Sequence, residues 1–110
     1  MRRAFAAVIL LVFGFGAAFA QPNALPKIAK DTDYAAARKT LSAQGFAPER
    51  LPDAAACEKD DPRCFPETFS CAGTGLAACL HVWRRGNSVI EVRTIGEQPI
   101  VDSLRCRSGC

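Results

Sequence analysis

The fold is decided by residues 77–95, AACLHVWRRGNSVIEVRTI, in which two mostly apolar runs flank a short Arg-Arg-Gly-Asn segment. The runs are rich in β-branched and apolar residues, which favour strands. Gly86 and Asn87 tolerate the positive φ that a tight connection needs. The stretch therefore predicts an antiparallel hairpin with strands at Ala77–Arg84 and Ser88–Ile95.

One further strand is expected before this hairpin and one after it. Glu67–Cys71 precedes it across a Gly-rich turn, and Ile100–Cys106 follows it across Gly-Glu-Gln-Pro. The segments together predict a small antiparallel meander of three to four strands.

A helix is expected before the strands. Tyr34 and Leu41 fall at helical spacing, and the preceding Asp-Thr-Asp at 31–33 offers capping side chains with charges suited to the helix dipole. Gly45 stands where a left-handed helix end belongs, and Phe46 is placed to fold back onto Leu41 in a Schellman ending.

We therefore expect an α+β fold in which one N-terminal amphipathic helix, about 32–44, packs on one face of the sheet. Residues 47–66 hold four prolines and two cysteines, which predicts an irregular, disulfide-bridged loop. The direction of the Trp83 side chain stays open at this point. The expected core residues are Tyr34, Leu41, Phe46, Phe69, Leu80, Val82, Trp83, Ile90, Val92, Ile95 and Leu104.

The N-terminal segment has the pattern of a secretory signal peptide. Two arginines precede an apolar run that ends in Ala-Phe-Ala at 18–20, so residues 1–20 are predicted to be removed after Ala20. Residues 21–30, with two prolines, are expected to form an extended lead-in, and residues 31–110 a single small domain. We expect a soluble bacterial protein, periplasmic or secreted, with no stable membrane insertion after cleavage.

The charge of the chain excludes one class of partner. Loss of Arg2 and Arg3 with the signal peptide lowers the formal charge from +3 to +1. A duplex-binding protein needs a clustered basic face that displaces counterions from phosphate. We therefore expect no nucleic-acid partner.

The cysteines indicate an oxidising compartment. An even number in a small exported domain is typical of a disulfide framework, which stabilises a chain with a modest core. Spacing favours three local pairs, although a rival arrangement ties the two C-terminal cysteines back to the first two. The six candidates, in the order of the favoured pairs, are Cys57 and Cys64, Cys71 and Cys79, and Cys106 and Cys110.

Metal and cofactor sites are not expected. The gaps between successive cysteines are six, six, seven, 26 and three residues, so only the last has the Cys-x2-4-Cys spacing usual in zinc sites. The oxidising compartment also works against free thiolates. The Cys-x-x-Cys redox motif and the haem-attachment motif are both absent from the sequence.

Catalysis is also not expected, because the chain has few side chains that could act as a nucleophile or as a general acid or base. His81 is the single histidine, and no motif supplies a nucleophile or an orienting acid for it. Glu67 and Glu91 are available carboxylates, but glycosidic cleavage needs two carboxyls at a set separation in a cleft. The alternative from this class is a small hydrolase, or a thiol-active enzyme with an unpaired cysteine.

The arginines in the second half of the chain suggest a more specific hypothesis about binding. All basic residues after position 67 are arginines, five against three acids. Guanidinium groups bind carboxylate and phosphate through paired hydrogen bonds. The other interpretation is that they are solvated charges which discourage association of strand edges. The candidates for an anion- or partner-binding surface are Arg84, Arg85, Arg93, Arg105 and Arg107.

The chain resembles a group of small exported bacterial proteins of unknown function. The most specific part of the resemblance is Cys-x-Gly-Thr-Gly-x3-Cys at 71–79. It implies a periplasmic setting and a helix-plus-sheet fold, and it carries no activity or catalytic residue. The matching residues are Tyr34, Arg38, Leu41, Gly45, Phe46, Pro48, Pro66, Glu67, Cys71, Gly73, Thr74, Gly75, Cys79, Trp83, Val92, Thr94, Gly96 and Glu97.

The sequence thus predicts a non-catalytic binding or interaction module that acts through its sheet face. Its expected partner is an envelope protein or an anionic glycan or lipid. A purely structural envelope protein is the remaining alternative.

Overall fold

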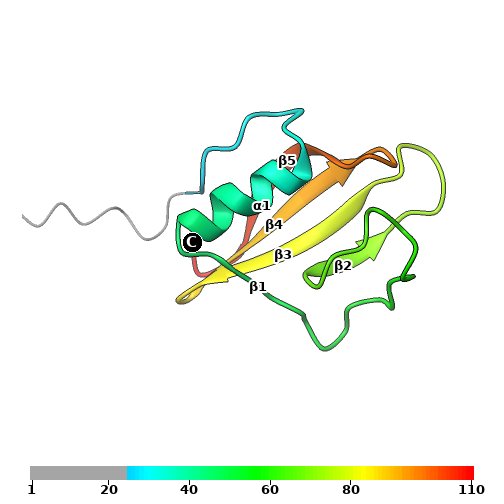
Figure 1. Ribbon diagram of the computed structural model, residues 1–110. Helices are drawn as coiled ribbons and strands as arrows, with labels where there is room; N and C mark the ends of the chain where they lie inside the picture. The colour runs from blue at the N-terminus through cyan, green and yellow to red at the C-terminus, as the bar shows by residue number, and fades with distance from the viewer. Residues whose placement is uncertain (1–24) are drawn as a thin grey trace, which may run out of the picture.

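The computed structural model describes residues 25–110, so the predicted signal peptide, residues 1–20, and the first part of the lead-in lie outside the described residues. One helix is followed by five strands (Figure 1). The elements are α1 (Tyr34–Ala43), β1 (Ala47–Pro48), β2 (Thr68–Cys71), β3 (Cys79–Arg85), β4 (Ser88–Ile95) and β5 (Ile100–Ser108).

The strands form one antiparallel sheet with β3 and β4 at its centre. β1 and β2 both pair with β3, and β5 pairs with β4. The sheet has five strands, so the predicted number of three to four was too low. The additional strand is Ala47–Pro48, at the start of the segment expected to be an irregular loop. A strand of two residues is too short to show the alternation of apolar and polar residues by which strands are predicted. Its proline is tolerated because the strand lies at an edge of the sheet.

The central hairpin was predicted correctly. β4 spans the expected Ser88–Ile95, and Gly86 and Asn87 alone separate it from β3. β3 begins at Cys79 rather than at Ala77, because Ala77 has a positive φ of 51° and belongs to the preceding turn.

The helix begins two residues later than predicted, at Tyr34. Its N-cap is Asp33, but the Asp33 side chain makes no capping hydrogen bond. The preceding residues instead bond to β5: the Asp31 amide donates to the Val101 carbonyl at 2.7 Å, and the Val101 amide donates to the Thr32 carbonyl at 2.8 Å. The backbone groups of Asp31 and Thr32 thus bond to β5 instead of continuing the helix, so the helix is shorter than predicted.

The C-terminal end of α1 confirms the predicted Schellman motif. Gly45 has φ +85°, the Phe46 amide donates to the Leu41 carbonyl at 3.0 Å, and the Gly45 amide donates to that of Ser42 at 3.1 Å. Phe46 and Leu41 are both buried in one core cluster.

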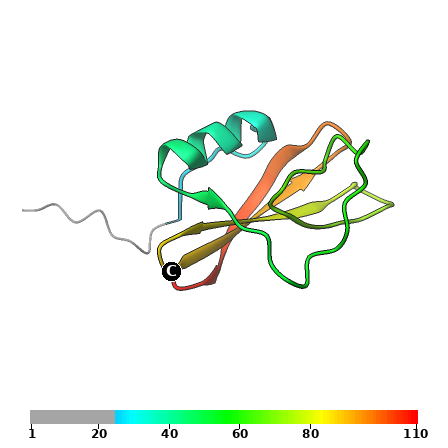
Figure 2. The same ribbon diagram turned by 60° about the horizontal axis from the view of Figure 1, so that its bottom comes forward.

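The core lies between α1 and one face of the sheet (Figure 2). Trp83 points into it, which settles the direction that the sequence left open. Phe69 and Leu80 are only half-buried, and the cavity on the opposite face is lined by Leu80. Ile95 and Leu104 were also expected to be fully buried and are not. The buried cluster consists of Tyr34, Ala37, Leu41, Phe46, Trp83, Ile90, Val92 and Val101.

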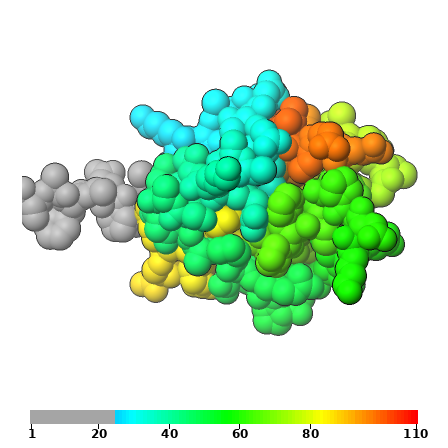
Figure 3. Space-filling model, viewed as in Figure 1, coloured from blue at the N-terminus to red at the C-terminus, as the bar shows by residue number. Residues whose placement is uncertain are grey.

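The side that carries α1 is closely covered. In the space-filling view, α1 and the chain between β1 and β2 lie over it together (Figure 3). Among residues 25–110 no helix combines the length and apolar character needed to cross a bilayer.

We predict that Leu41→Ala lowers the free energy of unfolding by about 2–5 kcal/mol, because it opens a cavity in the helix–sheet core. Urea denaturation measures the loss. Leu76→Ala is the matched control, since the Leu76 side chain is 65% exposed and its removal is expected to change stability by less than about 0.5 kcal/mol. Equal losses for the two variants would contradict this account of the core.

Candidate functional site

Strand alternation gives the sheet two different faces. His81 and Trp83 of β3 point toward α1, so their neighbours Leu80 and Val82 point to the other face. That second face carries no helix (Figure 2).

The register aligns four side chains in one row across this second face. Ser70 of β2 pairs with Leu80 of β3, Leu80 pairs with Arg93 of β4, and Arg93 pairs with Ser103 of β5. Directly paired residues in a sheet project to the same side. The row therefore has hydroxyls at its two ends and a leucine and an arginine between them.

A cavity of about 570 Å³ lies over this row. Its volume falls within the range of about 300–1,000 Å³ that is typical of small-molecule sites. The residues that line it are Ser70, Cys71, Ala72, Ala78, Cys79, Leu80, Glu91, Arg93, Ser103 and Arg105.

Glu91 lies in the next row of paired residues on this face, where it binds two arginines. Its side chain is only 4% exposed, and it accepts hydrogen bonds from Arg105 Nε and from Arg107 Nη1, the latter at 2.7 Å. Burial opposes ionisation of this carboxyl, but the two guanidinium groups outweigh it and hold the pKa of Glu91 below its usual value. Glu91 is therefore an ionised group that orients two arginines.

Two side chains from the outer strands meet beside this ion-pair cluster. The Arg107 guanidinium of β5 lies 5.0 Å from the centre of the Phe69 ring of β2. β2 and β5 are separated in the sheet by β3 and β4, so these two long side chains span the strands between them. We call the resulting hollow, defined by the ten lining residues given above, the concave cavity.

Arg93, the third arginine of this cluster, is also bound to an acidic side chain, that of Asp102. Arg93 Nη1 donates to Asp102 Oδ2, and Lys30 Nζ lies 3.9 Å from the other oxygen of Asp102. A register shift between Arg93 and Thr94 gives β5 one additional residue, Asp102, beside Arg93.

The structure brings together three of the five predicted arginines and separates the other two. Arg93 and Arg105 line the concave cavity, and Arg107 shares the Glu91 carboxylate with Arg105. Arg84 pairs with Glu49 at 3.4 Å, and Arg85 lies over the Phe46 ring at 4.4 Å near the end of α1. These two therefore do not belong to a common binding surface.

Sequence reasoning did not single out Ser70 and Ser103, which line the cavity. The signal that would have found them is alternation: Arg93, Ser103 and Arg105 share a face once the β4–β5 register is known.

All six cysteines are paired as the spacing favoured, in the bonds Cys57–Cys64, Cys71–Cys79 and Cys106–Cys110. Cys71–Cys79 joins directly opposed residues of β2 and β3, and both of its cysteines line the concave cavity.

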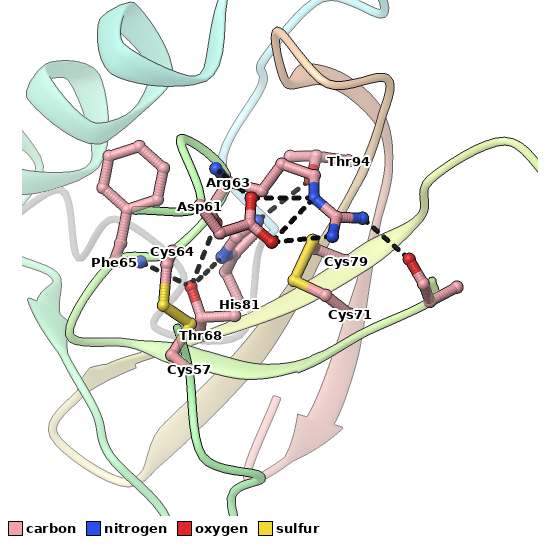
Figure 4. Close-up of a disulfide and its surroundings, with 11 residues drawn as sticks. Cys57, Asp61, Arg63, Cys64, Phe65, Thr68, Cys71, Cys79, His81 and Thr94 are labelled. Atoms are coloured by element: carbon pink, nitrogen blue, oxygen red, sulfur yellow. Dashed lines mark hydrogen bonds and ion pairs between the residues drawn. A yellow bond between two sulfur atoms is a disulfide. The ribbon is translucent and has the colours of Figure 1, made fainter. Parts of the chain in front are cut away.

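His81 lies on the opposite, helix-covered face (Figure 4). It is fully buried, its Nδ1 is 3.0 Å from Thr68 Oγ1, and its Nε2 is 3.0 Å from Thr94 Oγ1. The ring stacks on Tyr34 at 4.1 Å. Burial, with a smaller contribution from Arg38, lowers the pKa of His81 to about 3, so the ring is neutral at ordinary pH.

The two candidate carboxylates lie on opposite faces of the sheet. Glu67 is 1% exposed and contacts the helix: it accepts hydrogen bonds from Tyr34 Oη at 2.9 Å and from Arg38 Nε at 2.7 Å. Glu91 lies on the concave side. The two carboxyls therefore do not share a cleft.

Comparison of the chain with models of known protein families, with curated proteins and with solved structures gives no match. The resemblance to exported bacterial proteins stays a prediction, and the function is argued from the site itself.

The buried His81 predicts a specific pH dependence. Its folded pKa of about 3 lies below the ordinary 6.5, so between these values the unfolded chain binds a proton that the folded chain does not. Stability is therefore lost as the pH falls through this window, by up to about 1.4 kcal/mol per pH unit.

Urea denaturation at about pH 7, 6 and 5 measures this loss. His81→Gln, which keeps a polar side chain but cannot titrate there, is expected to remove most of the slope. An imidazole NMR signal that titrates near the ordinary pKa in the folded protein would contradict the assignment.

Proposed function

We propose that the protein is a non-catalytic binding module that holds an anionic ligand in the concave cavity. The observation that carries this proposal is the place of Arg93 and Arg105, which lie on the same uncovered face and line one cavity of ligand size. The ligand class is a molecule with a carboxylate or phosphate group, such as an anionic glycan, lipid or protein of the bacterial envelope.

The hydrogen-bonding state of these arginines supports anion binding. Arg93 donates to Asp102 through Nη1, and Arg105 donates to Glu91 through Nε. Within residues 25–110 the remaining guanidinium nitrogens of both side chains have no acceptor, so they can still donate to a ligand. The internal carboxylates orient the arginines without using all of their donors.

The catalytic alternative has less support. His81 is buried on the other face with both ring nitrogens beside threonine hydroxyls, and all six sulfurs are in disulfides. A substrate in the concave cavity would meet neither a histidine nor a thiol.

We also propose that the protein is exported to the bacterial periplasm after cleavage behind Ala20. The signal-like residues 1–20 and the three disulfides support this location, because disulfides persist in oxidising compartments.

The test is a thermal-shift screen of carboxylates, phosphates and amines with the oxidised protein. We expect anions to raise Tm in a concentration-dependent way, and Arg93→Gln to lower the anion affinity about tenfold. Arg84→Gln is the matched control, because Arg84 lies on the same sheet and pairs with an acid outside the cavity. The proposal fails if no anion shifts Tm or if both variants bind equally.

Glu91→Gln is expected to act in the opposite direction. It removes the charge that neutralises Arg105 and Arg107, so anion affinity should rise about two- to fivefold. Isothermal titration with the best anion of the screen measures the change, with Glu49→Gln as the control at the Arg84 pair. A loss of affinity in Glu91→Gln would mean that orientation of the arginines matters more than their neutralisation.

A further inference from the structure

The concave cavity has an apolar half and a cationic half. Leu80, Ala72 and Ala78 lie on the β2–β3 side. The charged and hydrogen-bonding groups on the β4–β5 side are Arg93, Ser103, Arg105 and Glu91.

This division follows the row of paired residues across the sheet. Neighbouring strands are about 4.8 Å apart, so Arg93 on β4 and Ser70 on β2 are separated by roughly 10 Å, with Leu80 between them. A ligand whose anionic group lies at Arg93 and Ser103 would therefore lay its next few carbon atoms over Leu80.

The charges of the cluster favour a single negative charge on the ligand. Three arginines, Arg93, Arg105 and Arg107, face two internal carboxylates, Glu91 and Asp102. Among these five groups one positive charge is left uncompensated. Lys30, whose Nζ lies 3.9 Å from Asp102 Oδ1, is 68% exposed and lies outside the cavity lining, so solvent screens its charge. A second negative charge on the ligand would meet Glu91 or Asp102. Like charges at such separations repel.

We propose that the concave cavity binds a monoanionic amphiphile, with its carboxylate or phosphodiester at Arg93 and Ser103 and its short alkyl chain over Leu80, Ala72 and Ala78. This inference rests on the proposed function and adds to it the class of ligand. It also fixes the orientation of the ligand across the strands.

The experiment is an isothermal titration of the oxidised protein with acetate, butanoate, hexanoate and octanoate, all below their micelle concentrations. Affinity is expected to rise about two- to fourfold per added methylene, because each one leaves water for the apolar half. Hexyl methyl phosphate tests the phosphodiester headgroup with a matched chain and charge, and hexylamine is the cationic control.

Two variants locate the ends of the ligand. Arg93→Gln is expected to weaken every acid about tenfold and to keep the dependence on chain length. Leu80→Ala is expected to flatten that dependence and to leave acetate unchanged, whereas Leu25→Ala, outside the cavity, should change neither. Contacts between octanoate methylenes and the Leu80 methyl groups, measured as intermolecular NOEs in the unaltered protein, test the same point without a substitution.

The outcomes separate the two proposals. Equal affinities for acetate and octanoate, or NOEs that avoid Leu80, would overturn the amphiphile and leave anion binding in place. Hexylamine binding as tightly as hexanoate, or no binding of any anion, would overturn both.

Discussion

Glu67 is the group on which the joining of helix and sheet depends. Its buried carboxylate accepts hydrogen bonds from Tyr34 and Arg38 of α1, and the Tyr34 hydroxyl in turn accepts one from Trp83 Nε1 at 3.0 Å. A buried carboxylate without partners would cost several kcal/mol, so this arrangement fixes the helix position. Burial, and then the neighbouring carboxylate, raise the pKa of Tyr34 above its usual value, which keeps the phenol a hydrogen-bond donor.

Because the helix side of the sheet is fully occupied, the other face is where the proposed ligand would bind. The buried polar groups of the helix side satisfy one another, and no buried side-chain nitrogen or oxygen in residues 25–110 lacks a partner. The concave face differs: its arginines are oriented by Glu91 and Asp102 and keep donors unused. Arg105 is 71% exposed although it is bound to a buried carboxylate. A guanidinium held in place and open to solvent is suited to recognise an anion without first losing side-chain entropy.

The disulfides act locally. They join residues only seven, eight and four positions apart. In the chain-entropy account, short loops gain less from closure than long ones, so these bonds fix individual turns more than the global fold. Cys71–Cys79 has the clearest consequence for function, since it holds β2 against β3 where both strands border the cavity. The helix–sheet core carries the long-range contacts.

The sequence alone predicted the helix, the central hairpin and the Schellman ending, and it favoured the local disulfide pairs, because each of these depends on residues close together in the chain. It did not determine β1, the place of Phe69 and Leu80, or which arginines meet. Arg93, Arg105 and Arg107 are the same residue type as Arg84 and Arg85, and only the β4–β5 register and the ion-pair partners separate the two groups. Strand register and ion pairs depend on contacts between distant segments, so only the tertiary structure decided the concave cavity.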